Sequence, residues 1–315
     1  TNMSGWPWMK GAKLAVAPVP PVCPEDDRKS VKDLIDEHRE KIDLIRAELK
    51  DEPLFDGFDK HDDLWLLRFY LSHKKTDAAV AAAKHTLAFR EKHKLDEKDI
   101  RPYAPHHIKE GMVATYWDKR CQGDAIVCAL PDDKRGIVMF LQFARFDPKA
   151  VDTLDEETWD YAFIYTSEWC HQWLDYVTRT TGRLTKSARF IDMTGVSMTK
   201  HMSRASSKRD AKIMNEMEDC YPQLLEKIFI VNAPEFMHLI WEFFRPIMPS
   251  RITSKIDVIA PKTNEKERKR LYQYLSDKHL PDDMGGQNSV PPVKWESCIF
   301  EKKKEKKDTE EEIWS

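Results

Sequence analysis

The feature that most constrains the fold is a regular alternation of short β-rich runs and longer helical runs after residue 103. The apolar runs 125–130 and 136–143 are separated by the turn sequence Pro-Asp-Asp-Lys-Arg-Gly. The second run is almost continuously apolar, as expected of a strand that is covered on both faces. Further strands are predicted at 187–193, 227–231 and 255–259, and helices at 155–177, 206–221, 233–248 and 265–276. Such alternation predicts an α/β fold with a mainly parallel sheet and right-handed crossovers.

Helical periodicity dominates the first third of the chain. Ser30 is a favourable N-cap for a helix that extends to about Leu49. A short, densely apolar helix is predicted next. An alanine-rich helix then follows Thr76 and Asp77, which we expect to cap it. Together these helices predict an N-terminal helical subdomain over residues 29–103.

Composition narrows the class of protein. The formal net charge of −3 argues against a general nucleic-acid binder, which is usually basic. The six cysteines are scattered and no two have CxxC spacing, which favours free thiols in a reducing compartment such as the cytoplasm. The Pro-rich residues 1–28 lack a period and predict a flexible tail, and residues 289–315 predict a charged C-terminal tail.

The run Ala233–Met248 is apolar on nearly all sides when it is drawn as a helix. Phe236, Ile240, Phe243 and Phe244 share one face, and a second apolar stripe lies beside it. A surface helix needs one apolar stripe, so this segment needs partners on two sides. Two interpretations are open at this point. The segment is either a central core helix, or a lid with one face on an apolar cavity and the other able to meet a membrane.

Five short sequences occur in an order that is found in one known family. They are Leu-Leu-Arg-Phe from Leu66, Ile-Asp-Met-Thr-Gly-Val from Ile191, Tyr-Pro-Gln to Asn-Ala-Pro from Tyr221, Thr-Ser-Lys-Ile from Thr253, and Leu-Pro-Asp-Asp-Met-Gly-Gly from Leu280. In this order the chain resembles the CRAL-TRIO lipid-binding domain family, which includes phosphatidylinositol- and phosphatidylcholine-transfer proteins. The resemblance covers about residues 31–286.

The resemblance implies a fold and a function. It implies a helical subdomain followed by a mixed, mostly parallel sheet with flanking helices over residues 104–288. It also implies an apolar cavity that holds one lipid, and a helical gate that opens at a membrane surface. The residues expected at the cavity and the gate are Phe140, Tyr165, Met193, Phe236, Ile240, Phe243 and Phe244. The protein is then expected to transfer lipid without catalysis and to associate peripherally with membranes.

The resemblance also implies where a lipid headgroup would bind. Lys74, Lys75 and Lys255 match positions that meet the headgroup phosphate in phosphatidylinositol-transfer members. Gln223 stands where the family has a Glu that contacts inositol, and Ile252 stands where it has a Thr. Both departures remove hydrogen-bonding capacity suited to inositol hydroxyls. The ligand is therefore left open between phosphatidylinositol, another phospholipid and a sterol.

Other functions have weaker support in the sequence than lipid transfer. The chain has no GxSxG, Walker or GxGxxG sequence, so we predict that it is not an enzyme. No cofactor beyond a bound lipid and no metal is expected. Haem is the alternative, because Tyr165, His171 and His201 lie on or near the elements expected to form the cavity. A further alternative is a lipid sensor that presents its ligand to a partner enzyme.

Overall fold

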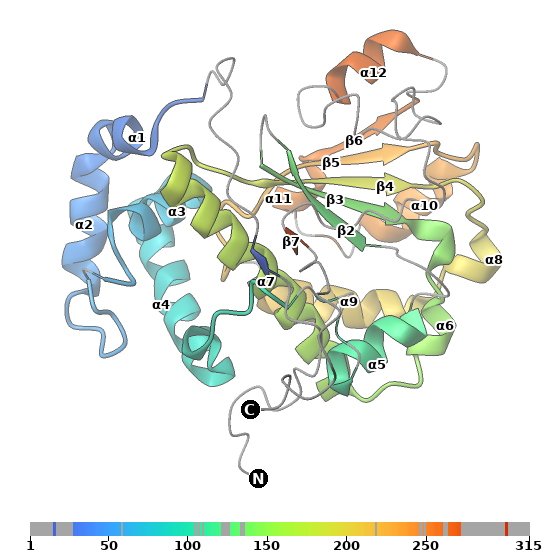
Figure 1. Ribbon diagram of the computed structural model, residues 1–315, viewed down its shortest axis with the longest axis horizontal. Coiled ribbons are helices and arrows are strands. Elements are labelled where there is room, and N and C mark those ends of the chain that lie inside the picture. The colour runs from blue at the N-terminus through green and yellow to red at the C-terminus, as the bar shows by residue number, and fades with distance from the viewer. Residues whose placement is uncertain are drawn as a thin grey trace, which may run out of the picture.

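The computed structural model describes most of the chain between residues 28 and 271. The described residues are 15–16, 28–57, 59–103, 105, 108, 110–120, 127–132, 136–217, 219–245, 248, 250–260, 264–271 and 300–301. Within them, a group of N-terminal helices lies beside a sheet that is flanked by further helices (Figure 1). None of the helices in these ranges is long and apolar enough to cross a membrane.

The N-terminal helices form the left part of Figure 1. They are α1 (Val31–Glu37), α2 (Arg39–Leu49), α3 (Asp63–His73) and α4 (Thr76–His93). Their shared core includes Ile42, Ile45, Leu66, Phe69 and Ala83, all fully buried. The helical subdomain predicted from the periodicity is therefore present in the structure.

The ends of these helices differ in detail from the prediction. Ser30 caps α1 as expected, because its hydroxyl accepts a hydrogen bond from the Asp33 amide at 3.0 Å. The single helix predicted to reach residue 49 is two helices, separated at His38, where φ is −112° and ψ is 17°. Thr76 and Asp77 do not cap α4. The cap residue is Lys75, which makes no side-chain cap bond, so Thr76 is already the first helical residue.

The sheet has five strands in the described residues, in the order β2-β3-β4-β5-β6. They are β2 (Val127–Asp132), β3 (Gly136–Gln142), β4 (Ser187–Asp192), β5 (Leu225–Val231) and β6 (Ile256–Ile259). β2 is antiparallel to β3, and the other neighbours are parallel. The predicted mixed, mostly parallel sheet is thus confirmed. Pro131 and Asp132 belong to β2 and not to the turn in which the sequence placed them.

Several helices flank the sheet. They are α5 (Gly111–Arg120), α6 (Pro148–Val151), α7 (Glu156–Thr181), α8 (Met198–His201), α9 (Arg204–Glu216), α10 (Met237–Phe244), α11 (Ser250–Thr253) and α12 (Glu265–Leu271), with the short 3-10 helix η3 (Phe143–Arg145). A second 3-10 helix, η1 (Leu95–Glu97), follows α4 in the helical subdomain. The long helix predicted from residue 155 is confirmed as α7, and Asp155 caps it. The helix predicted over 233–248 is shorter in the structure than in the prediction, since α10 covers eight residues.

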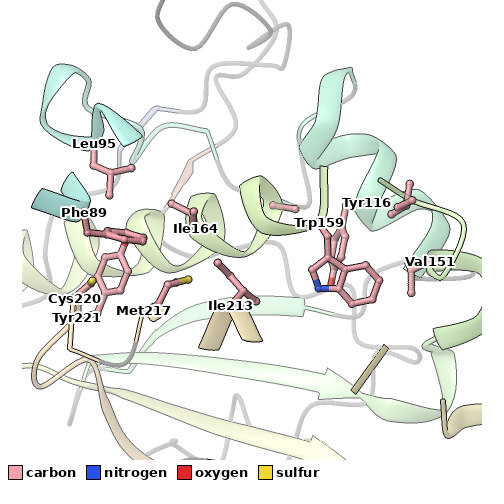
Figure 2. Packing of buried hydrophobic residues seen from close by; sticks show 12 residues of the cluster. Phe89, Leu95, Tyr116, Val151, Trp159, Ile164, Ile213, Met217, Cys220 and Tyr221 are labelled. Atoms are coloured by element: carbon pink, nitrogen blue, oxygen red, sulfur yellow. The ribbon is translucent and has the colours of Figure 1, made fainter. Parts of the chain in front are cut away.

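One core joins the helical subdomain to the sheet domain along α7. Figure 2 shows Phe89 near Tyr221 at one end of this cluster and Tyr116 against Trp159 at the other. The rings of Tyr116 and Trp159 meet edge to face, with centroids 5.5 Å apart. Trp159 is fully buried. The position of the subdomain beside the sheet is therefore fixed by shared apolar packing.

The segments predicted as separate tails meet in the structure. β1 (Ala15–Val16) pairs antiparallel with β7 (Phe300–Glu301), with Ala15 opposite Glu301. The remaining residues of 1–27 and of 289–315 lie outside the described residues, so the predicted flexibility of the first tail stays a prediction.

Candidate functional site

A large pocket lies between the sheet and the helices beside it. Its volume is about 960 Å³, near the upper end of the roughly 300–1,000 Å³ typical of ligand pockets. Strands β3, β4 and β5 contribute to its walls, and so do α5, α7, α9 and α11 and the C-terminal end of α3. Its apolar lining includes Leu141, Phe143, Phe163, Ile191, Met214 and Ile228.

The strand period explains which side chains form the sheet wall of the pocket. Successive residues of a strand point to opposite faces. On β4, Arg189 and Ile191 line the pocket, whereas Ala188 and Phe190 are buried on the other face. The parallel register places Arg189 opposite Ile228 of β5. This wall is therefore largely apolar, with one guanidinium in it.

The pocket carries more positive than negative residues. Eight lining residues are Lys or Arg and three are Asp or Glu, although the whole chain has a formal net charge of −3. Two of the arginines are paired: Arg120 with Asp210 at 3.0 Å and Arg251 with Asp219 at 2.5 Å. The surplus of cations favours a ligand with an anionic group.

Four of the five residues predicted at the headgroup line this pocket. We call the part around Lys74, Lys186 and Lys255 its cationic end, because the charge of Lys74 lowers the pKa of Lys186 and the charge of Lys186 lowers the pKa of Lys255. Lys74, Gln223, Ile252 and Lys255 all line it, whereas Lys75 caps α4 and is outside the lining. Lys74 and Gln223 both have φ of 63°. The Gln223 amide donates to the Ser72 hydroxyl at 2.9 Å, which joins the end of α3 to the turn before β5.

Burial and like charges act on the lysines at this end. Burial lowers the pKa of Lys255, and the charges of Lys186, Arg251 and Arg189 lower it further, while Glu226 opposes them. Burial likewise lowers the pKa of Lys186. The Lys255 ammonium donates to the carbonyl of Leu225 at 2.5 Å. Such a cluster favours an anion, because an anion relieves the repulsion among its members.

Sequence reasoning missed Lys186 and Arg189 as pocket residues. Arg189 lies within a run that was predicted to be a strand next to buried strands. A charged residue in the middle of such a strand is rarely buried without a partner. This charged residue in the middle of the strand could have identified Arg189 as a pocket residue from the sequence.

Four of the seven residues predicted for the cavity wall and the gate have described side chains, and none of these four lines the pocket. Tyr165 is 1% exposed, outside the pocket lining, and its hydroxyl donates to the Tyr103 carbonyl at 2.8 Å. Met193 and Ile240 are buried in a cluster against which Phe236 packs. The side chains of Phe140, Phe243 and Phe244 lie outside the described part of the chain.

The cluster below α10 is continuous with the pocket wall. Leu225, Ile228 and Ile252 belong to or pack against it, and all three also line the pocket. On α10 itself, Ile240 is 3% exposed and points to this cluster, whereas Leu239 is 44% exposed. The helix predicted as a gate thus lies one layer of side chains away from the pocket.

The three residues considered as haem ligands have other neighbours. Tyr165 donates to the Tyr103 carbonyl, as described above. The His171 ring packs against Tyr221, with centroids 5.5 Å apart. His201 accepts a hydrogen bond from the Ser197 amide through Nδ1 at 2.8 Å. The described residues contain no group of three or more His, Cys, Asp or Glu side chains arranged to hold a metal ion.

Comparison with known families decides the relationship. The CRAL/TRIO domain matches residues 122–286, which is more than half of the chain. This chain belongs to the CRAL/TRIO domain family. The match includes β2 to β6 and the helices between them, and therefore most of the pocket wall.

Individual relatives agree with this membership. The chain is similar to the SEC14 cytosolic factor of Candida glabrata, with 23% identity over 287 residues, 87% of this chain and 86% of that protein. It is 26% identical over 101 residues to the Arabidopsis thaliana phosphatidylinositol/phosphatidylcholine transfer protein SFH12, of which it spans 18%. A CRAL-TRIO domain-containing protein of Caenorhabditis elegans is 23% identical over 234 residues, 30% of that protein. The chain therefore spans less than a third of these last two relatives.

A solved structure shows the same fold. The crystal structure of Sfh5 matches with a TM-score of 0.53 at 15% identity, covering 84% of this chain and 90% of that one. The similarity extends beyond the matched domain into the helical subdomain, since residues 122–286 alone are a smaller share of the chain.

Proposed function

We propose that this protein binds one lipid in the pocket and transfers it between membranes, without catalysing a reaction. The observation that carries the proposal is the pocket itself, with an apolar sheet wall and a cationic end. An acyl chain in the apolar part gains about 0.8 kcal/mol for each methylene removed from water. Membership of a family with phosphatidylinositol/phosphatidylcholine transfer relatives supports the same conclusion.

We propose that Lys74 and Lys255 bind the headgroup phosphate. Both line the pocket at one end, and charge-assisted hydrogen bonds to phosphate are stronger than neutral ones. Gln223 and Ile252 lie beside them, and neither supplies the carboxylate or hydroxyl expected for inositol recognition. The Gln223 amide is already bonded to Ser72. This end therefore suits a phosphate better than it suits an inositol ring.

Entry and exit of the lipid are assigned to α10. Movement of this helix would uncover the cluster that it shares with Leu225, Ile228 and Ile252 in the pocket wall. The exposed Leu239 side chain would meet the bilayer first. The protein would act in the cytoplasm and contact membranes transiently, in keeping with its similarity to a SEC14 cytosolic factor.

A lipid-transfer assay with a blocked pocket tests this function. Ala211 of α9 lines the pocket, so Ala211→Trp places an indole inside it. Ala47→Trp on the exposed face of α2 is the matched control. We expect transfer of a fluorescent phospholipid between vesicles by the unchanged chain and by the control, and about tenfold slower transfer by Ala211→Trp, as a loss of about 1.4 kcal/mol of binding would give. Equal rates for all three proteins would contradict the proposal.

A further inference from the structure

Arg189 is a cation in the sheet wall of the pocket. It lies in the middle of β4, with Ile191 lining the pocket two residues later on the same face. Its neighbour across the parallel ladder on β5 is Ile228, which is also part of the lining. The side chain is half-buried, and its Nε is shielded from solvent.

The guanidinium of Arg189 has no counter-charge in the described residues. Its shielded Nε has no hydrogen-bond partner, and the side chain belongs to none of the ion pairs found in this part of the chain. Burial lowers the pKa of Arg189, and the group that opposes this effect is the Cys170 thiol. Burial raises the pKa of that thiol to about 11. Cys170 is therefore neutral at pH 7, whereas an arginine stays protonated in proteins.

Three other basic residues of the same pocket do have carboxylate partners. Arg120 has Asp210 at 3.0 Å, Arg251 has Asp219 at 2.5 Å, and Lys29 has Glu37 at 2.6 Å. A buried charge is costly unless it is paired. Among the described residues, Arg189 is the arginine of the sheet wall, and it has no such carboxylate partner, like the lining lysines Lys74, Lys186 and Lys255.

A second cation faces the same space. Lys255 is close enough to Arg189 for their charges to repel each other, and Lys186 adds to the repulsion at Lys255. Both lysines line the pocket with Arg189. An anion between Arg189 and Lys255 would be attracted by both. A quaternary ammonium at the same place would be repelled by both.

We propose that Arg189 binds the acid group of the lipid, so that the pocket selects lipids with a net negative charge over zwitterionic and uncharged ones. The inference rests on the proposed function, since it concerns which lipids the pocket accepts. The chemistry is that of an oxyanion, either a phospholipid phosphate or a fatty-acid carboxylate. The planar guanidinium donates two parallel hydrogen bonds to either group. Arg189 is thereby a specificity-determining residue in the sheet wall.

A competition for loading tests the assignment. The full chain is incubated with vesicles containing equal amounts of phosphatidylcholine, phosphatidic acid, oleic acid and cholesterol, then repurified, and its lipid is quantified by mass spectrometry. We expect enrichment of the two acidic lipids over phosphatidylcholine and cholesterol. Whether phosphatidic acid or oleic acid dominates then identifies phosphate or carboxylate as the bound group.

Substitutions connect the selectivity to Arg189. Arg189→Gln should reduce the ratio of acidic lipid to phosphatidylcholine about tenfold, as loss of one charged hydrogen-bonding group does. Arg189→Lys should keep part of the ratio, since it keeps the charge without the planar fork. The matched control is Lys227→Gln on the neighbouring strand β5. Lys227 lies outside the pocket lining and pairs with Asp257 at 2.9 Å, so its substitution should leave the ratio unchanged.

The outcomes separate this inference from the proposed function. Lipid uptake in proportion to supply, or an unchanged ratio in Arg189→Gln, overturns the role of Arg189 and leaves lipid binding intact. No uptake of any lipid by the unchanged chain overturns both. Arg189→Met provides a second folded variant if Arg189→Gln melts early, and the same loss of ratio is expected from it.

Discussion

The ion pair between Arg90 and Glu168 gives the sharpest test of how the helical subdomain is held on the sheet domain. Arg90 of α4 donates to both carboxylate oxygens of Glu168 on α7, at 2.9 and 3.1 Å. Gln172 donates a third hydrogen bond at 3.0 Å. The Glu168 side chain is completely buried. Burial opposes its ionisation, but the charge and hydrogen bonds of Arg90, together with the Gln172 hydrogen bond, hold the pKa of Glu168 below its usual value.

Glu168→Ala should therefore be strongly destabilising. Removal of one partner of a buried pair costs about 3–5 kcal/mol, because the other charge stays buried. We expect the lower end, about 3 kcal/mol, since Arg90 keeps Asp96 at 2.6 Å. Asp96→Asn is the matched control, because it removes the other carboxylate that pairs with the Arg90 guanidinium. The Asp96 side chain is 38% exposed, so its loss should cost about 1 kcal/mol or less.

Urea unfolding and thermal melting distinguish these two variants. The free energy of unfolding should fall about three times further for Glu168→Ala than for Asp96→Asn. At about 2 °C for each kcal/mol in a chain of this size, the melting temperature should fall by about 6 °C for Glu168→Ala and about 2 °C for Asp96→Asn. Equal losses in the two variants, or a loss below 1 kcal/mol for Glu168→Ala, would refute the role assigned to burial.

Two further predictions concern His171 and Lys255. Burial lowers the pKa of His171 to about 4, whereas the unfolded chain has a histidine pKa of about 6.5. Between these two pH values the unfolded chain binds a proton that the folded chain does not. The free energy of unfolding should therefore fall as the pH falls from about 6.5 to about 4, by up to about 3 kcal/mol. His171→Gln should flatten this limb in melts recorded at a series of pH values, and an unaltered slope would contradict it. Lys255→Met should weaken loading of phosphatidic acid about tenfold and leave cholesterol loading unchanged when each lipid is supplied alone. Equal losses for both lipids would show that Lys255 acts through packing.

Much of the fold follows from periodicity in the sequence. Strands β4, β5 and β6 and the long helix α7 lie close to the ranges predicted for them. Each of these segments has a clear apolar pattern and is bounded by residues that end a strand or helix. The end of α3 and the turn directly after β5 were less predictable. Lys74 and Asn232 adopt positive φ, at 63° and 53°, and neither is a glycine. Tertiary contacts impose such conformations on the chain, so local propensity does not reveal them.

The site was less predictable than the fold. A strand pattern shows that two faces exist, but it does not show which face meets a pocket and which meets the core. Arg189 and Phe190 are adjacent in the sequence, yet one lines the pocket and the other is fully buried. Tyr165 likewise lies on α7 beside the pocket wall, but its side chain is turned to the Tyr103 carbonyl in the core. The headgroup role of Lys74 and Lys255 followed from resemblance to the family and stays a prediction. Both residues line the pocket.

The most direct test of the account is native mass spectrometry of the full chain after incubation with vesicles of mixed lipids. We expect one species heavier than the chain by the mass of a single lipid, and a return to the mass of the bare chain after organic extraction. The extract should contain that lipid in equimolar amount. A protein that keeps the mass of the bare chain under every lipid mixture would contradict the claim that the pocket of about 960 Å³ is built to hold a lipid.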